Sequence, residues 1–149
     1  MRALGLAVAA VFLAAAAPDT LEAPLTPTPG DPVSGRRIVE DRALSACLLC
    51  HAGPFPAPHL HGSIGPTLDG IGDRLSPGQI RLRLVDSRRV NPDTVMPAYL
   101  STAGLNRVGA AWSGKPILTE TGIEDVVAFL TTLRTTPGPS VPGTSPRTP

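Results

Sequence analysis

Both cysteines of the chain lie in one short stretch, Cys47-Leu48-Leu49-Cys50-His51. Side chains three and four positions apart share a face of a helix, so two thiols and an imidazole would point to one side. This is the spacing used for covalent haem attachment. Aromatic residues make up only 3% of the chain, and a haem would supply apolar bulk that the core otherwise lacks. The sequence therefore predicts one haem c on Cys47 and Cys50, with His51 as an axial iron ligand.

A redox-active cysteine pair and half of a zinc site are the alternatives for this stretch. A thioredoxin-like motif follows a buried strand in a βαβ unit, and no strand pattern precedes Cys47. A zinc site needs two further ligands, but there is no third cysteine, and only His59 and His61 could complete a loose set. Haem attachment is the favoured interpretation.

Met96 is the candidate for the second axial ligand. Apart from the initiator it is the only methionine, and it lies in the loop 91–97 instead of on an apolar helix face. A lone methionine commonly fills a gap in a core, but methionine opposite histidine is a standard pairing in cytochromes c and raises the reduction potential. His59 and His61 are the rivals; they follow His51 so closely that we interpret them as loop residues.

Composition sets the two ends of the chain apart. Residues 1–17 combine a basic start with an apolar run ending in small residues, which predicts a secretory signal peptide and a periplasmic protein; an uncleaved anchor is the alternative. Residues 18–30 and 135–149 are rich in proline and have no hydrophobic period, which predicts a linker and a tail without order. We expect one domain at 31–134.

Two helices are predicted in the first two thirds of the chain. Asp31 followed by Pro32 is typical of a helix start, and the apolar residues that follow indicate a helix over 33–44. Ser76 before Pro77 opens a second helical pattern, which should end before Asn91-Pro92.

The third predicted helix has the clearest pattern. Apolar residues recur at helical spacing from Ile123 to Leu133, with Phe129 beside them, and the helix should end before Pro137. Thr121 with Glu124 is a candidate capping box. No segment alternates at period two for long, so the fold class predicted is a small all-α domain.

Charge excludes one class of function. The formal net charge is only +1, so wholesale nucleic-acid binding is not expected. A basic stretch is nevertheless present, made of Arg74, Arg81, Arg83, Arg88 and Arg89. We expect most of these to be solvated helix-face charges; the alternative is that some meet haem propionates or an acidic partner.

With these motifs, the chain resembles class I cytochromes c and, more closely, the SoxX family, the monohaem subunits of the SoxAX thiosulfate-oxidising complex. The resemblance covers about residues 31 to 133 and rests on GDPVSGRRIVEDR, CLLCH, VMPAYL, GLNRVG and GKPILT. CLLCH alone indicates only a cytochrome c, and the last three strings narrow it to SoxX.

Further residue roles belong to this resemblance. A backbone carbonyl in residues 65–68 could accept the free ring N–H of His51, and the family pattern implies that Pro66 supplies it. It also implies that Leu68 packs on the haem and that Gly35 packs against Phe129.

The resemblance implies a periplasmic electron-transfer subunit that is not itself catalytic. Its partner SoxA would join thiosulfate oxidatively to a cysteine of a SoxYZ-like carrier, and this chain would take up the electrons and pass them to a downstream cytochrome. With both cysteines used by the haem, no free thiol remains for sulfur chemistry. The alternatives are a freely diffusing monohaem cytochrome c shuttle and a haem enzyme with an open iron position.

Overall fold

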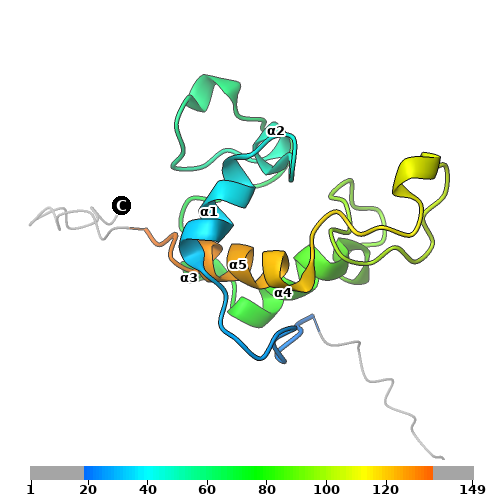
Figure 1. The fold of residues 1–149 in the computed structure, drawn as a ribbon. Helices are drawn as coiled ribbons and strands as arrows, with labels where there is room; N and C mark the ends of the chain where they lie inside the picture. Colours follow the sequence, from blue (N-terminus) through cyan, green and yellow to red (C-terminus); the bar gives the residue numbers. More distant parts are fainter. Residues whose placement is uncertain (1–18, 136–149) are drawn as a thin grey trace, which may run out of the picture.

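The computed structural model describes residues 19–135 (Figure 1). Residues 1–17, predicted to be a signal peptide, lie outside that range, as does all but the first residue of the tail 135–149. Within the range the chain forms helices and no strand, which confirms the all-α prediction. None of the helices in the described range is long and apolar enough to cross a membrane. The elements are α1 (Pro32–Glu40), α2 (Cys47–Cys50), η1 (Pro58–Leu60), α3 (Ile71–Arg74), α4 (Pro77–Asp86), η2 (Ser87–Arg89), η3 (Ala110–Trp112) and α5 (Glu120–Leu130).

Helix α1 begins as predicted and ends sooner. The carboxylate of Asp31 accepts hydrogen bonds from the backbone N–H groups of Val33 and Ser34, with Pro32 in the first turn. The prediction that the helix extends to Leu44 was wrong. Asp41 leaves the helical conformation, and its carboxylate instead accepts from the backbone N–H groups of Ala43 and Leu44.

The central contact of the fold is the crossing of α1 and α5 (Figure 1). A Cβ atom on Gly35 would overlap the carbonyl oxygen of Asp125 and lie 2.8 Å from the Cβ of Phe129. This confirms the implied contact between Gly35 and Phe129. Because glycine has no side chain, the two backbones approach closely enough for Val39, which is 1% exposed, to enter the core.

Helix α4 confirms the predicted start at Ser76. The hydroxyl of Ser76 accepts from the backbone N–H of Gln79, and the Gln79 side-chain carbonyl accepts from the Ser76 N–H, which forms a capping box. The helical path continues through η2 and ends before Asn91-Pro92, as expected.

Helix α5 confirms the third helix, but its predicted cap was wrong. Thr119, not Thr121, is the N-cap, and its hydroxyl accepts from the backbone N–H of Gly122. Glu124 is therefore one full turn inside the helix and has another role. The regular helix ends at Leu130, short of Leu133.

Glu124 and Arg81 form a buried ion pair between α5 and α4. Arg81 Nε and Nη2 donate to the two carboxylate oxygens at 2.6 and 2.9 Å, and each side chain is only 6% exposed. The expectation of solvated arginines is wrong for Arg81, because it pairs with an acid 43 positions away. Burial alone would raise the pKa of Glu124, but the hydrogen bonds from Arg81 and Leu25 and the charge of Arg81 hold it below its usual value.

The same ion pair holds the N-terminal segment 19–30, which has no helix. Arg81 Nη1 donates to the carbonyl oxygen of Leu21 at 2.8 Å, and the backbone N–H of Leu25 donates to Glu124 at 3.0 Å. Leu21 N–H in turn donates to the carbonyl oxygen of Gly78 at 3.0 Å. The sequence predicts a disordered linker here, whereas the structure has a strap packed on α4 and α5. A proline-rich composition indicates that a segment is not helical, but it does not indicate that the segment makes no contacts with the core.

We expect Gly35→Ala to lower the free energy of unfolding by about 1–3 kcal/mol, because the added methyl group forces α1 and α5 apart. Chemical denaturation of the two proteins measures this change. Gly122→Ala is the matched control: a Cβ there meets nothing nearer than 3.4 Å, so it should be neutral or stabilise α5 by up to about 1 kcal/mol. Equal effects of the two substitutions would contradict the close crossing.

We expect Arg81→Met to destabilise the fold by about 3–5 kcal/mol, because it leaves the Glu124 carboxylate buried without its cation. Chemical denaturation of the variant and the wild type measures this loss.

The ion pair should also make the stability of the fold depend on pH. The pKa of Glu124 is lower in the folded state, so its stabilisation is complete above the ordinary value of 4.5 and is lost as the pH falls through the lowered value. The stability difference between wild type and Glu124→Gln should therefore shrink in acid. A difference that is constant from neutral pH into that acid range would contradict this role.

Candidate functional site

The cysteine motif lies on α2, a single turn of helix. Cys47 and Cys50 are both half-buried, and Leu48 between them is in the core at 6% exposure. His51 follows the helix in extended conformation, although its backbone N–H still donates to the carbonyl oxygen of Cys47. The motif therefore occupies one helical turn plus its C-cap, and not the continuous helix that the spacing argument assumes.

The chain returns from the loop after His51 and runs back along α2. The backbone N–H of Gly62 donates to the Leu48 carbonyl at 2.9 Å, and that of Gly65 donates to the Cys50 carbonyl at 2.8 Å. Leu68 N–H donates to the Ala52 carbonyl at 2.8 Å. Residues 62–68 are thus fixed to the motif by backbone hydrogen bonds.

This return fixes the His51 ring. Its Nδ1 lies 2.6 Å from the carbonyl oxygen of Pro66, and because a carbonyl only accepts, Nδ1 carries the proton. Gly65 lies against the ring, where a Cβ atom would overlap Cε1. The structure therefore brings Pro66 and His51 together and leaves Nε2 as the free ligand nitrogen. Sequence reasoning did not single out Gly65.

Met96 is held by its backbone on the loop after η2. Its N–H donates to the Thr94 hydroxyl at 3.1 Å, and its carbonyl accepts from the hydroxyl of Ser87 at 2.6 Å. Ser87 is only 4% exposed. Sequence reasoning missed Ser87, because nothing local marks a serine nine positions away as a tether.

Tyr99, also missed, links the two halves of the site. It is the only tyrosine of the chain and is 4% exposed. Its hydroxyl donates to the carbonyl oxygen of Ser45 at 2.8 Å and lies 3.7 Å from Cys47 Sγ. Burial raises the pKa of Tyr99, and the nearby Cys47 and Cys50 thiols add to the shift.

These groups line one cavity of about 670 Å³. Cys47, Cys50, His51 and Met96 are all on its wall, with Leu68 and Tyr99. Nine further lining residues are leucine, isoleucine or valine: Leu49, Ile64, Ile71, Leu75, Ile80, Leu84, Val90, Val95 and Leu130. A cavity of this size and character suits a large apolar ligand with a few polar anchors.

His59 and His61 are not on the cavity wall. Nε2 of His61 donates to the Pro56 carbonyl at 3.1 Å, and its ring meets Phe55 edge-on. Within residues 19–135 there is no group of three or more His, Cys, Asp and Glu side chains that could hold a metal ion. The zinc alternative thus has no ligand set in this part of the chain.

The other arginines of the basic stretch differ in their exposure and in their partners. Arg74 and Arg89 are exposed, as expected, and Arg88 pairs with Asp86 at 2.7 Å. Arg74 and Arg83 reach the cavity wall. Arg83 Nη1 donates to the Gln79 carbonyl, and Arg74 donates to backbone carbonyls of Thr67 and Asp69.

An all-α fold with a CLLCH turn and a methionine on the wall of one apolar cavity defines a class I cytochrome c. No protein-family model matches the sequence, and no curated protein matches it either. Among the solved structures, the crystal structure of SoxXA from P. pantotrophus matches with a TM-score of 0.71 and 41% sequence identity, over 78% of this chain and 91% of that chain. The chain belongs to the SoxX family of cytochromes c.

The residues present fit the haem that this class carries. Two thiols at the spacing of haem attachment reach a cavity with aliphatic walls, which suits a porphyrin. His51 has one ring nitrogen committed to Pro66 and the other free, which is the state of an iron-binding imidazole.

We expect Tyr99 to stay protonated until the protein unfolds in alkali. The pKa of Tyr99 is higher in the folded state than in the unfolded state. Its contribution to the free energy of unfolding is therefore complete below pH 10.0, the ordinary pKa, and is lost as the pH rises above that value. Burial is the largest cause and does not depend on the thiols being free. As this is the only tyrosine, the tyrosinate absorbance of wild type minus that of Tyr99→Phe follows one group. A titration centred near 10.0 in the folded protein would contradict this environment.

Proposed function

We propose that this chain is the electron-accepting subunit of a periplasmic thiosulfate-oxidising complex. The single observation that carries this proposal is the cavity on which both cysteines, His51 and Met96 meet. Cys47 and Cys50 would hold one haem c by thioether bonds, and His51 and Met96 would bind its iron. The bound haem would supply a one-electron iron(III)/iron(II) couple.

The residues around the ligands support electron transfer rather than substrate chemistry. The Pro66 carbonyl orients the His51 ring and leaves Nε2 as the nitrogen that would bind iron. Ser87 and Thr94 fix the backbone of Met96. Two ligands held in this way would leave no open iron position, which counts against the alternative of a haem enzyme.

The proposed partner is a SoxA-like cytochrome subunit, because the 41% identical relative is a SoxXA complex. On the SoxA-like subunit, thiosulfate would join the cysteine thiol of a SoxYZ-like carrier. A sulfur–sulfur bond would form, the thiol would lose its proton, and two electrons would be released. This chain would accept those electrons one at a time and pass each to a downstream cytochrome. With its only two cysteines used in haem attachment, this chain would contribute no thiol nucleophile.

The test of the site is Met96→Ala in protein matured with covalent haem. We expect loss of the methionine-to-iron band in the oxidised spectrum and a lower reduction potential, because the thioether is the ligand that raises it. His61→Ala is the matched control and should leave both unchanged, since His61 is not on the cavity wall. An unchanged Met96→Ala spectrum would favour the haem-enzyme alternative.

The test of the complex is co-purification with a SoxA-like subunit expressed in the same periplasm. A stable heterodimer would support the proposal, whereas a monomer with the same spectrum would favour the diffusing shuttle.

A further inference from the structure

Residues 102–117 form an excursion away from the helical core, in yellow in Figure 1. Backbone hydrogen bonds tie both ends of it to the core: Ser101 N–H donates to the Val85 carbonyl at 3.0 Å, and Leu118 N–H donates to the Tyr99 carbonyl at 2.9 Å. Between these anchors the only regular element is the single turn η3. The excursion is thus fixed at its base and projects from the fold.

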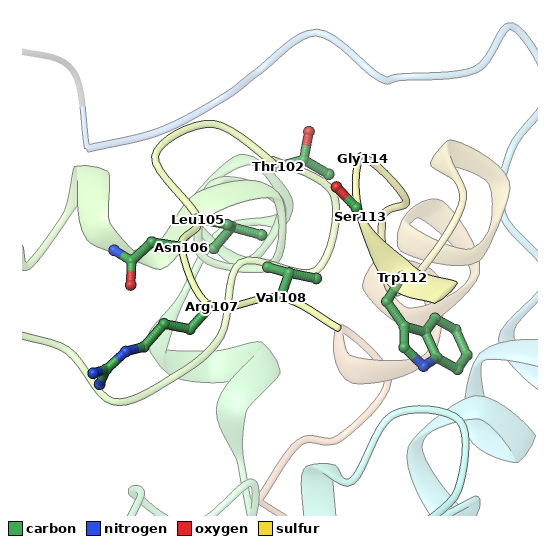
Figure 2. A pocket seen from close by; sticks show the side chains of 8 residues that line it. All are labelled: Thr102, Leu105, Asn106, Arg107, Val108, Trp112, Ser113 and Gly114. Carbon is green, nitrogen blue, oxygen red and sulfur yellow. The ribbon is translucent and has the colours of Figure 1, made fainter. Parts of the chain in front are cut away.

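Apolar side chains of the excursion are exposed instead of joining the core. The exposed fractions are 49% for Leu105, 39% for Val108, 68% for Trp112 and 44% for Ile117. Leu105, Val108 and Trp112 border a hollow of about 300 Å³, shown in Figure 2. A tryptophan left mostly in water beside aliphatic neighbours is typical of a surface that another protein covers.

The charge of this surface has one sign. No Asp or Glu occurs between Asp93 and Glu120, and the excursion carries Arg107 and Lys115. Figure 2 shows Arg107 and Trp112 projecting to opposite sides of Val108. Two copies of this chain paired through this same surface would bring like charges together, so a partner that presents carboxylates beside apolar side chains complements it better.

Arg107 also adopts a backbone conformation that favours glycine, with φ of +58°. Its side chain points away from Leu105 and Val108 (Figure 2), so contacts within the excursion do not explain an arginine here. Arginine and tryptophan are the residue types that most often dominate binding energy at protein interfaces.

We propose that the 102–117 excursion is the surface on which the SoxA-like subunit docks. Trp112, with Leu105 and Val108, is the apolar anchor, and Arg107 and Lys115 meet carboxylates of the partner. This inference rests on the proposed function and adds to it where on the chain the partner binds.

The experiment measures the affinity of the haem-loaded chain for the SoxA-like subunit. We expect Trp112→Ala to weaken binding by about 30-fold or more, as for a central interface residue. Arg107→Gly should weaken it while the melting temperature is maintained, because glycine adopts φ of +58° without strain. Wild-type affinity should fall with added salt.

A paired substitution separates docking from folding. A Cβ atom on Gly109 meets nothing within 4 Å, so neither Gly109→Ala nor Gly109→Glu disturbs the chain itself. Gly109→Ala should bind within about twofold of wild type, whereas Gly109→Glu places a carboxylate against an acidic partner and should bind at least about tenfold more weakly. Val33→Glu, at another exposed apolar residue on α1, is the control for a general charge effect and should bind like wild type.

The outcomes distinguish the two proposals. Tight binding by wild type, with Trp112→Ala and Gly109→Glu equally tight, overturns the docking surface and leaves the proposed complex intact. If the wild-type chain does not bind the SoxA-like subunit, the proposed complex and the docking surface are both overturned. The same conclusion holds if the wild-type chain binds anionic lipid vesicles through residues 102–117 but does not bind the subunit.

Discussion

The close approach of α1 and α5 is the constraint from which the rest of this fold follows. One glycine, Gly35, allows the two backbones to meet over the carbonyl of Asp125. Once they cross, Val39 and Phe129 are buried on one side, and α2 and the cysteine motif are brought to the edge of the cavity. The site is therefore positioned in part by a contact between helices near the two ends of the domain.

A second layer of constraint comes from polar groups that bridge distant segments. Arg81 and Glu124 fix α4 to α5 and hold the strap 19–30 by its backbone. Ser87 binds the carbonyl of Met96 and so fixes the Met96 loop to the end of α4. Tyr99, three residues after Met96, fixes the same part of the chain to Ser45. Each of these groups is buried, so each depends on its partner to replace the hydrogen bonds it would make to water.

The sequence predicted best what is local. The cysteine motif, the cap at Asp31 and the helix start at Ser76 each depend on residues a few positions apart, and the fold class follows from helical periodicity. One error was local, because Asp41 ends α1 by accepting hydrogen bonds from Ala43 and Leu44. Other errors occurred where tertiary contacts decide the outcome. Glu124 looked like a capping residue because its partner is 43 positions away, and Arg81 looked solvated for the same reason. The strap 19–30 looked disordered because composition contains no information about the carbonyl groups that Arg81 binds.

The way the two candidate ligands are held has a consequence for the speed of electron exchange. His51 is fixed through Pro66 and Gly65, and the backbone of Met96 is fixed on both sides by Thr94 and Ser87. The His51 ring and the backbone of Met96 are therefore both restrained by hydrogen bonds to other parts of the fold. With the proposed haem bound, a site held in this way would need little backbone rearrangement between oxidation states, and the barrier to each electron transfer would then be set mainly by distance and solvent.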